Sequence, residues 1–181
     1  MRPSADEIKR ALELEPHPTC GFVRETFRSD ETLPTEALPG FDGPRPRGSV
    51  LYFLVTPDAR MALHRIRPDQ MYHHYLGDPL EVLLLYPDGS GAVETVGQDL
   101  EAGMRPQLFI PAQTWHVSRV RPGGEYALLS TTEWPGVEPP DVEVGDPDGL
   151  AERFPELAPR IAEFSAEGES GALRAAQSPS S

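Results

Sequence analysis

The sequence predicts an all-β fold, an antiparallel sandwich or barrel with helices only near its ends. Two observations support this prediction. After Gly48 the chain becomes a series of short apolar or alternating runs, which is the pattern of strands. Turn sequences separate these runs, among them Gly77-Asp78-Pro79 and Asp88-Gly89. The predicted strands are SVLYFLV, MALHRI, MYHHYL, LEVLLLY, GAVETVG, QLFIP, HVSRV and EYALLSTTEW.

The first expected element is a short helix near residues 5–14. Ser4 and Glu7 have the spacing of a capping box, in which each side chain accepts from the other residue's backbone N–H. The helical pattern stops before Pro16. A loop, residues 30–48, comes before the strands, because its stretch from Glu31 on holds four prolines and three glycines. Loops of this length without secondary structure are often functional.

A second helical region is expected after Gly145. Asp148 is a suitable cap, and Pro155 and Pro159 interrupt the pattern. The last stretch, residues 165–181, lacks aromatic and β-branched residues, which is typical of a disordered tail. We therefore expect one domain over residues 1–164. The apolar stripe of the helical region is Leu150, Phe154, Leu157 and Ile161.

Composition excludes several functions. The chain has 29 acidic and 16 basic residues, a net charge of -13, and its arginines are scattered, so nucleic acid is not an expected partner. The first fifteen residues carry charges throughout, unlike a secretory signal, and no stretch approaches the ~18 apolar residues of a membrane span. We expect a cytoplasmic protein without membrane contact. The single cysteine, Cys20, is expected to be a structural thiol.

Histidine is scarce, and four of the five histidines fall on predicted strands. Together with Glu81 they supply imidazole nitrogens and a carboxylate. Such ligands suit one divalent transition-metal ion, Zn, Fe, Mn, Ni or Cu, without selecting among them. The alternative is that these are ordinary hydrogen-bonded histidines of a sheet. The four are His64, His73, His74 and His116; the fifth is His17.

Two spacings resemble the two motifs of the cupin superfamily. His73 and Glu81 resemble the first motif, although Tyr75 stands where that motif has a second histidine. The run PAQTWH, which ends at His116, resembles the second motif, with Gln113 in place of its glycine. The resemblance implies that His73, Glu81 and His116 are metal ligands.

The resemblance extends to one small cupin family of unassigned function, close in fold to sugar-nucleotide epimerases of the RmlC type. Its matches span roughly residues 16–160 and include HPTCGFVRETFRS, LHR, GDPLE, RPQLFIPAQTWH and WPG. Thr19, Cys20 and Tyr72 depart from it. The resemblance implies a double-stranded β-helix, which is a jelly-roll barrel, and a homodimer, because exposed strand edges in such folds are often covered by a second subunit.

A jelly-roll barrel can hold one small ligand at its mouth. Arginine and aromatic side chains there would suit a sugar-like or acidic metabolite. The residues that we expect to bind substrate are Arg24, Tyr52, Arg65, Gln107 and Trp115. We expect His64 and Tyr75 to be catalytic, as general base and acid of an epimerase-like reaction.

Three functions remain open from the sequence. The first is a metal-assisted isomerase, epimerase or lyase acting on a small polar metabolite. The second is a metal-free epimerase-like enzyme with His64 as base. The third is a cupin that binds a ligand without turnover.

The two adjacent histidines cannot both face the barrel interior. Residues two apart share a face of a strand, so His73 and Tyr75 share one face and His74 lies on the other. The cupin resemblance places His73 at the first ligand position, so we predict that His73 points into the barrel and His74 away from it. A β-bulge at Tyr72 or His73 would reverse this register, but no glycine marks one there.

Overall fold

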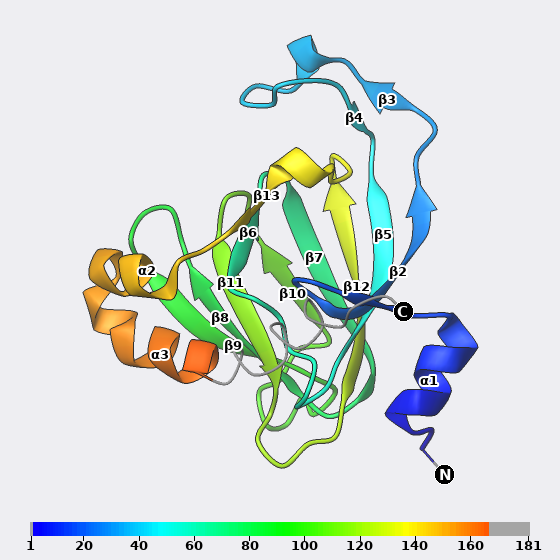
Figure 1. Ribbon diagram of the computed structural model, residues 1–181, viewed down its shortest axis with the longest axis vertical. Coiled ribbons are helices and arrows are strands. Elements are labelled where there is room, and N and C mark those ends of the chain that lie inside the picture. Colours follow the sequence, from blue (N-terminus) through cyan, green and yellow to red (C-terminus); the bar gives the residue numbers. More distant parts are fainter. Residues whose placement is uncertain (1, 167–181) are drawn as a thin grey trace, which may run out of the picture.

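The computed structural model describes residues 2–166 and confirms the jelly-roll prediction. Among these residues, strands make up 44% and helices 20%. Two antiparallel sheets pack face to face, as Figure 1 shows, with helices at both ends of the chain. No helix among the described residues is long and apolar enough to cross a membrane.

The larger sheet has six strands. In spatial order they are β1 (Glu15–His17), β2 (Gly21–Arg28), β5 (Ser49–Val55), β12 (Ala127–Trp134), β7 (Asp69–Gly77) and β10 (Gln107–Ile110). The smaller sheet has five, in the order β13 (Val142–Val144), β6 (His64–Ile66), β11 (Trp115–Val120), β8 (Leu80–Leu85) and β9 (Gly91–Val96). Every predicted run contains a strand of these two sheets, and β1, β2 and β13 are the strands of the two sheets that were not predicted.

The N-terminal helix α1 (Ala5–Leu12) begins as predicted, with both bonds of the Ser4–Glu7 capping box present. The C-terminal region forms α2 (Pro147–Arg153), the 3-10 helix η3 (Pro155–Leu157) and α3 (Ala158–Ala166). The expected cap at Asp148 is wrong: Asp146 caps α2 by accepting from the N–H of Gly149, because Pro147 takes the first helical position. The predicted tail lies outside the described residues, except for its first two, which belong to α3.

The Pro- and Gly-rich stretch, residues 30–48, forms an arm that extends beyond the barrel in Figure 1. It contains the short strands β3 (Thr32–Leu33) and β4 (Arg45–Pro46), which pair with each other, and the 3-10 helix η1 (Thr35–Ala37). At its base the buried Arg45 donates to Asp141 from Nε at 2.7 Å and from Nη2 at 2.8 Å. Asp141 ends η2 (Pro139–Asp141), so this ion pair joins the arm to the barrel.

Apolar side chains fill two separate layers around the smaller sheet. Phe53, Tyr72 and Leu129 from the larger sheet meet Val82, Leu84 and Val120 from the smaller sheet in the barrel interior. On the outer face of the smaller sheet, Leu83, Leu85 and Val117 pack against Phe154, Ile161 and Phe164 of the C-terminal helices. Both faces of this sheet are therefore covered, and only the inner one faces the barrel interior.

Candidate functional site

The face of strand β7 that points into the barrel is the opposite of the one that we predicted. Gln70, Tyr72 and His74 are buried, while His73 is half-buried on the other face. The prediction that His73 points into the barrel is therefore wrong. Tyr72 belongs to the interior core, and alternation along the strand fixes its neighbours. The pairing with β12 also shifts by one residue at Tyr75, a β-bulge three residues from Tyr72.

The outer face of the larger sheet collects several of the predicted site residues. The His73 ring lies 3.0 Å from the Gln107 amide and 3.3 Å from the Thr132 hydroxyl. The Tyr75 hydroxyl shares a hydrogen bond of 2.8 Å with Ser130, and its ring meets the edge of Tyr52 at a centroid distance of 5.9 Å. These residues come together, but outside the barrel.

Two predicted arginines also lie away from the interior. Arg24 is the cross-strand partner of Tyr52 and pairs with Glu13 just after α1. Arg65 donates to Glu143 at 2.6 Å, and its guanidinium stacks over the Trp115 ring at 4.5 Å. Both guanidinium groups are thus paired with carboxylates outside the barrel.

Glu81 lies on the outer face of the smaller sheet. Its carboxylate accepts from Arg119 Nε at 3.0 Å. Arg119 also donates to Glu163 of α3 at 2.6 Å and lies over the Phe164 ring at 4.3 Å. Glu81 therefore helps to hold the C-terminal helix, and it cannot meet His116 inside the barrel.

His64 and His116 are the predicted site residues that do meet inside. They are cross-strand partners on β6 and β11, and their ring centroids are 4.2 Å apart. His64 Nδ1 lies 2.8 Å from the carbonyl oxygen of Ala62, and His116 Nδ1 lies 3.1 Å from that of Thr114. A carbonyl oxygen can only accept, so Nδ1 carries the hydrogen in both rings. In the neutral rings each Nε2 is left with a lone pair.

Gln70 connects the two sheets across the barrel. Its Nε2 lies 3.3 Å from His116 Nε2 and donates to it, and its Oε1 accepts from the Thr131 hydroxyl at 3.3 Å. The sequence interpretation missed Gln70 and Thr131, because it assigned β7 to the wrong face. The signal that could have found them is the alternation that places Gln70 on the same face as Tyr72.

Burial keeps both histidines neutral. It lowers the pKa of His64 from 6.5 to about 4, and the hydrogen bond to Ala62 opposes this shift. It also lowers the pKa of His116 well below its ordinary value, and the neighbouring His64 adds to this shift. Near neutral pH the two rings are therefore hydrogen-bond acceptors without charge.

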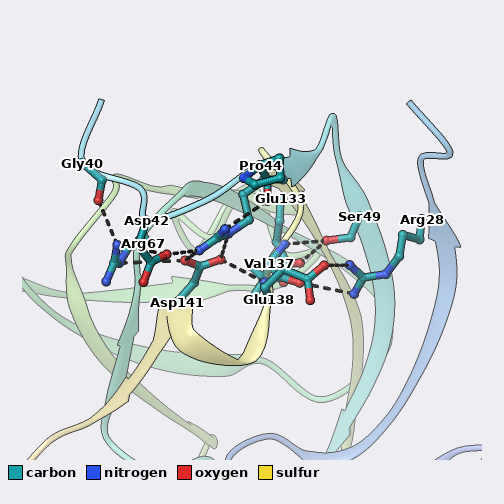
Figure 2. Close-up of polar contacts among 11 residues, drawn as sticks. Arg28, Gly40, Asp42, Pro44, Ser49, Arg67, Glu133, Val137, Glu138 and Asp141 are labelled. Carbon is teal, nitrogen blue, oxygen red and sulfur yellow. Dashed lines mark hydrogen bonds and ion pairs between the residues drawn. The ribbon is translucent and has the colours of Figure 1, made fainter. Parts of the chain in front are cut away.

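Glu133 is a buried carboxyl on β12, the cross-strand partner of Gln70. The Ser49 hydroxyl donates to it at 2.5 Å, an arrangement visible in Figure 2. Burial raises the pKa of Glu133 from 4.5 to about 7, and the bond from Ser49 opposes this only in part. This group can hold or release a proton near neutral pH.

The residues present do not fit a transition-metal site. The structure separates His73, Glu81 and His116 onto three different surfaces. Among residues 2–166, no three His, Cys, Asp or Glu side chains lie close enough together to hold a metal ion. His64 and His116 supply only two imidazoles, whereas such sites use three or four protein ligands.

Comparisons with known proteins match this architecture. The family described as Cupin superfamily (DUF985) matches residues 6–145. An uncharacterized protein of Saccharomyces cerevisiae is 27% identical over 144 residues, which is 75% of this chain and 72% of the yeast protein. A solved structure of a hypothetical protein from Leishmania major superposes with a TM-score of 0.81 at 26% identity, over 90% of this chain and 98% of the other. The solved structure of a protein from Shewanella oneidensis superposes with a TM-score of 0.78 at 27% identity, over 90% of this chain and 97% of the other.

Proposed function

Because the chain belongs to the cupin superfamily, in its DUF985 family, we propose that it binds a small polar metabolite in the barrel interior, at His64, His116 and Gln70. The observation that carries this proposal is the pair of neutral imidazoles, each with Nδ1 bound to a backbone carbonyl. Buried polar groups are usually satisfied within the protein. His116 Nε2 accepts from Gln70, so the lone pair of His64 Nε2 is the one that suits a ligand's donor.

The chemistry of the site favours a neutral, hydroxyl-bearing ligand, such as a sugar-like molecule, over an acidic one. His64 Nε2 and the Glu133 carboxyl accept hydrogen bonds, and a hydroxyl group can donate to them. The arginines that would hold an acid, Arg24 and Arg65, are paired with carboxylates outside the barrel. An acidic ligand would therefore be buried without a counter-charge, which is costly.

Turnover at this site would be metal-free proton transfer, as in an isomerase or epimerase. Glu133 is the better general base, since a pKa of about 7 matches the working pH. His64, with a pKa of about 4, would instead orient the ligand as an acceptor. Tyr75 cannot serve as the acid, because its hydroxyl lies with Ser130 on the far face of the larger sheet. A binding protein without turnover would use the same contacts.

A thermal-shift screen of neutral sugars and polyols against small carboxylates tests the proposal. A ligand of the folded state raises its apparent stability by about 2.7 kcal/mol at a concentration of 100 times Kd. We expect a saturable increase in Tm with at least one neutral compound, lost in His64→Ala and kept in His73→Ala. A response to carboxylates alone, or one abolished by His73→Ala, would contradict it. Elemental analysis showing one tightly bound metal ion per chain would contradict the metal-free chemistry.

A further inference from the structure

A second candidate site lies outside the barrel, between the arm and the smaller sheet. It is a pocket of about 280 Å³. We call it the arm pocket. Its lining includes Gly40 of the arm, Arg65 and Arg67 around β6, Gln113 before β11, and Asp141 and Glu143 around β13.

The wall beside the arm is fixed by the ion pair at the arm's base. The Asp141 side chain is fully buried and accepts from Arg45 through both carboxylate oxygens. It also accepts from the backbone N–H of Glu138 at 2.9 Å. Figure 2 shows how these bonds hold Asp141 beside Asp42 and Arg67. Asp141 is thus occupied, and it forms part of the frame of the pocket.

Arg67 is held in place but keeps donors free. Its Nη1 donates to the carbonyl oxygen of Gly40 at 2.9 Å. The carboxylates of Asp42 and Asp141 lie 3.8 Å from its Nη1 and Nε, beyond hydrogen-bond distance. Within residues 2–166, its Nε and Nη2 therefore have no hydrogen-bonded partner. A guanidinium edge with two N–H groups matches the two oxygens of a carboxylate.

Gln113 brings a second free group to the pocket. Its φ is 63°, a left-handed conformation that favours glycine, and its backbone N–H donates to the carbonyl oxygen of Ile66 at 3.0 Å. No partner in the described part of the chain bonds its side-chain amide. Strained residues of this kind cluster at ligand sites. The strain at Gln113 has an explanation if its amide binds a ligand.

We propose that the arm pocket binds a small monocarboxylate, with Arg67 and Gln113 donating to its oxygens. The acidic neighbours Asp42, Asp141 and Glu143 repel further negative charge, so a monoanion fits better than phosphate or a dicarboxylate. Arg65 is hydrogen-bonded to Glu143, whereas Arg67 lies 3.8 Å from the carboxylates of Asp42 and Asp141, so the N–H groups of Arg67 remain available to a ligand. This site is separate from the barrel interior and takes a different class of ligand.

An NMR titration of the full chain tests the proposal directly. The signals to follow are the Nε–H of Arg67 and the side-chain amide of Gln113, with acetate, lactate and benzoate as ligands. Benzamide and inorganic phosphate serve as comparators. We expect saturable shifts of both signals with at least one monocarboxylate, and at least tenfold weaker binding of benzamide and phosphate. Absence of saturation with all three acids, or equal binding of benzoate and benzamide, would overturn the proposal. So would tighter binding of phosphate.

Two variants separate binding from structure. Gln113→Gly relieves the left-handed strain and removes the amide, so we expect a higher Tm with about tenfold weaker carboxylate binding. Arg67→Gln should weaken binding at least tenfold. Arg47→Gln is the matched control, because Arg47 pairs with Glu31 on the arm away from this pocket, and it should keep affinity within twofold. If Gln113→Gly keeps its affinity, the strain has no role in binding and the proposed contact is wrong.

Discussion

Burial raises the pKa of Glu133 and lowers the pKa of His64. The folded chain holds the Glu133 proton up to about pH 7, whereas the unfolded chain releases it near 4.5. Its contribution to stability therefore falls as pH rises through that window. The folded chain keeps His64 neutral down to about pH 4, whereas the unfolded chain protonates it below 6.5. Its contribution falls as pH drops through that window. Between pH 4.5 and 6.5 the two groups therefore change the free energy of unfolding with pH in opposite directions.

Replacing Glu133 should remove its contribution to the pH dependence of the free energy of unfolding and leave the contribution of His64. We expect the free energy of unfolding of Glu133→Gln, relative to the unmodified chain, to increase by about 3 kcal/mol between pH 4.5 and 7.5. Urea unfolding at several pH values within this range measures it. Glu101→Gln, which replaces a carboxylate at an exposed position, is the control variant. A pH-independent difference for Glu133→Gln would show that Glu133 is ionised across the range.

At the scale of elements, the turn glycines differ in what surrounds them. Gly77, at the end of β7, has φ +98°, and a Cβ there would lie 2.3 Å from the carbonyl oxygen of Tyr126. Gly89, in the hairpin between β8 and β9, has φ +92°, and a Cβ there would meet nothing within 4 Å. The same conformation is thus required at both, but only one is enclosed by its neighbours.

We therefore expect Gly89→Ala to lower the free energy of unfolding by about 1 kcal/mol, the cost of the left-handed conformation alone. Gly77→Ala should cost more than ~3 kcal/mol, because the backbone must also move away from Tyr126. Urea unfolding of both variants measures the difference. Equal costs would mean that the end of β7 can move without affecting the barrel.

The joint between the arm and η2 depends on a buried ion pair. Removing the Asp141 carboxylate leaves Arg45 buried without a counter-charge, so Asp141→Ala should lower the free energy of unfolding by about 3 kcal/mol or more. Asp42→Ala removes the exposed second partner of Arg45 and should cost less than about 1 kcal/mol. Denaturant titration of the two variants checks this ranking, and a reversed order would contradict it.

The strands could be predicted from the sequence, but their inner faces could not. Turn residues and alternation located the eight predicted strands between residues 49 and 134. In MYHHYL, however, both faces carry one histidine together with apolar or aromatic residues, so the pattern alone does not distinguish them. The cupin spacing then placed His73 and Glu81 inside. Tertiary packing decided otherwise: Tyr72 fills the interior, and the C-terminal helices bury the outer face that carries Glu81.

At the scale of the whole molecule, residues 2–166 include a stacked aromatic pair that is exposed to solvent. Phe109 and Trp134 lie with ring centroids 6.2 Å apart and are 46% and 40% exposed, at the β10 edge of the larger sheet. Exposed apolar groups at an open strand edge favour association. We expect a homodimer that uses this edge.

Light scattering should therefore give about twice the chain mass of 19.9 kDa. Phe109→Glu should shift the particle to the mass of a single chain without loss of Tm, because the ring is half exposed. A single-chain mass for the unmodified protein would contradict the dimer, and a dimeric Phe109→Glu would locate the interface elsewhere.

The bond between Gln70 and His116 spans the two sheets, so its length depends on their separation. If the barrel swells while each sheet keeps its own hydrogen bonds, this contact is lost although the strand pairing survives. The ¹⁵N chemical shift of His116 Nε2 senses whether that lone pair is accepting a hydrogen bond. This chemical shift therefore reports on the separation of the two sheets. Its change while the strand hydrogen bonds persist would distinguish an expanded core from an unfolded chain.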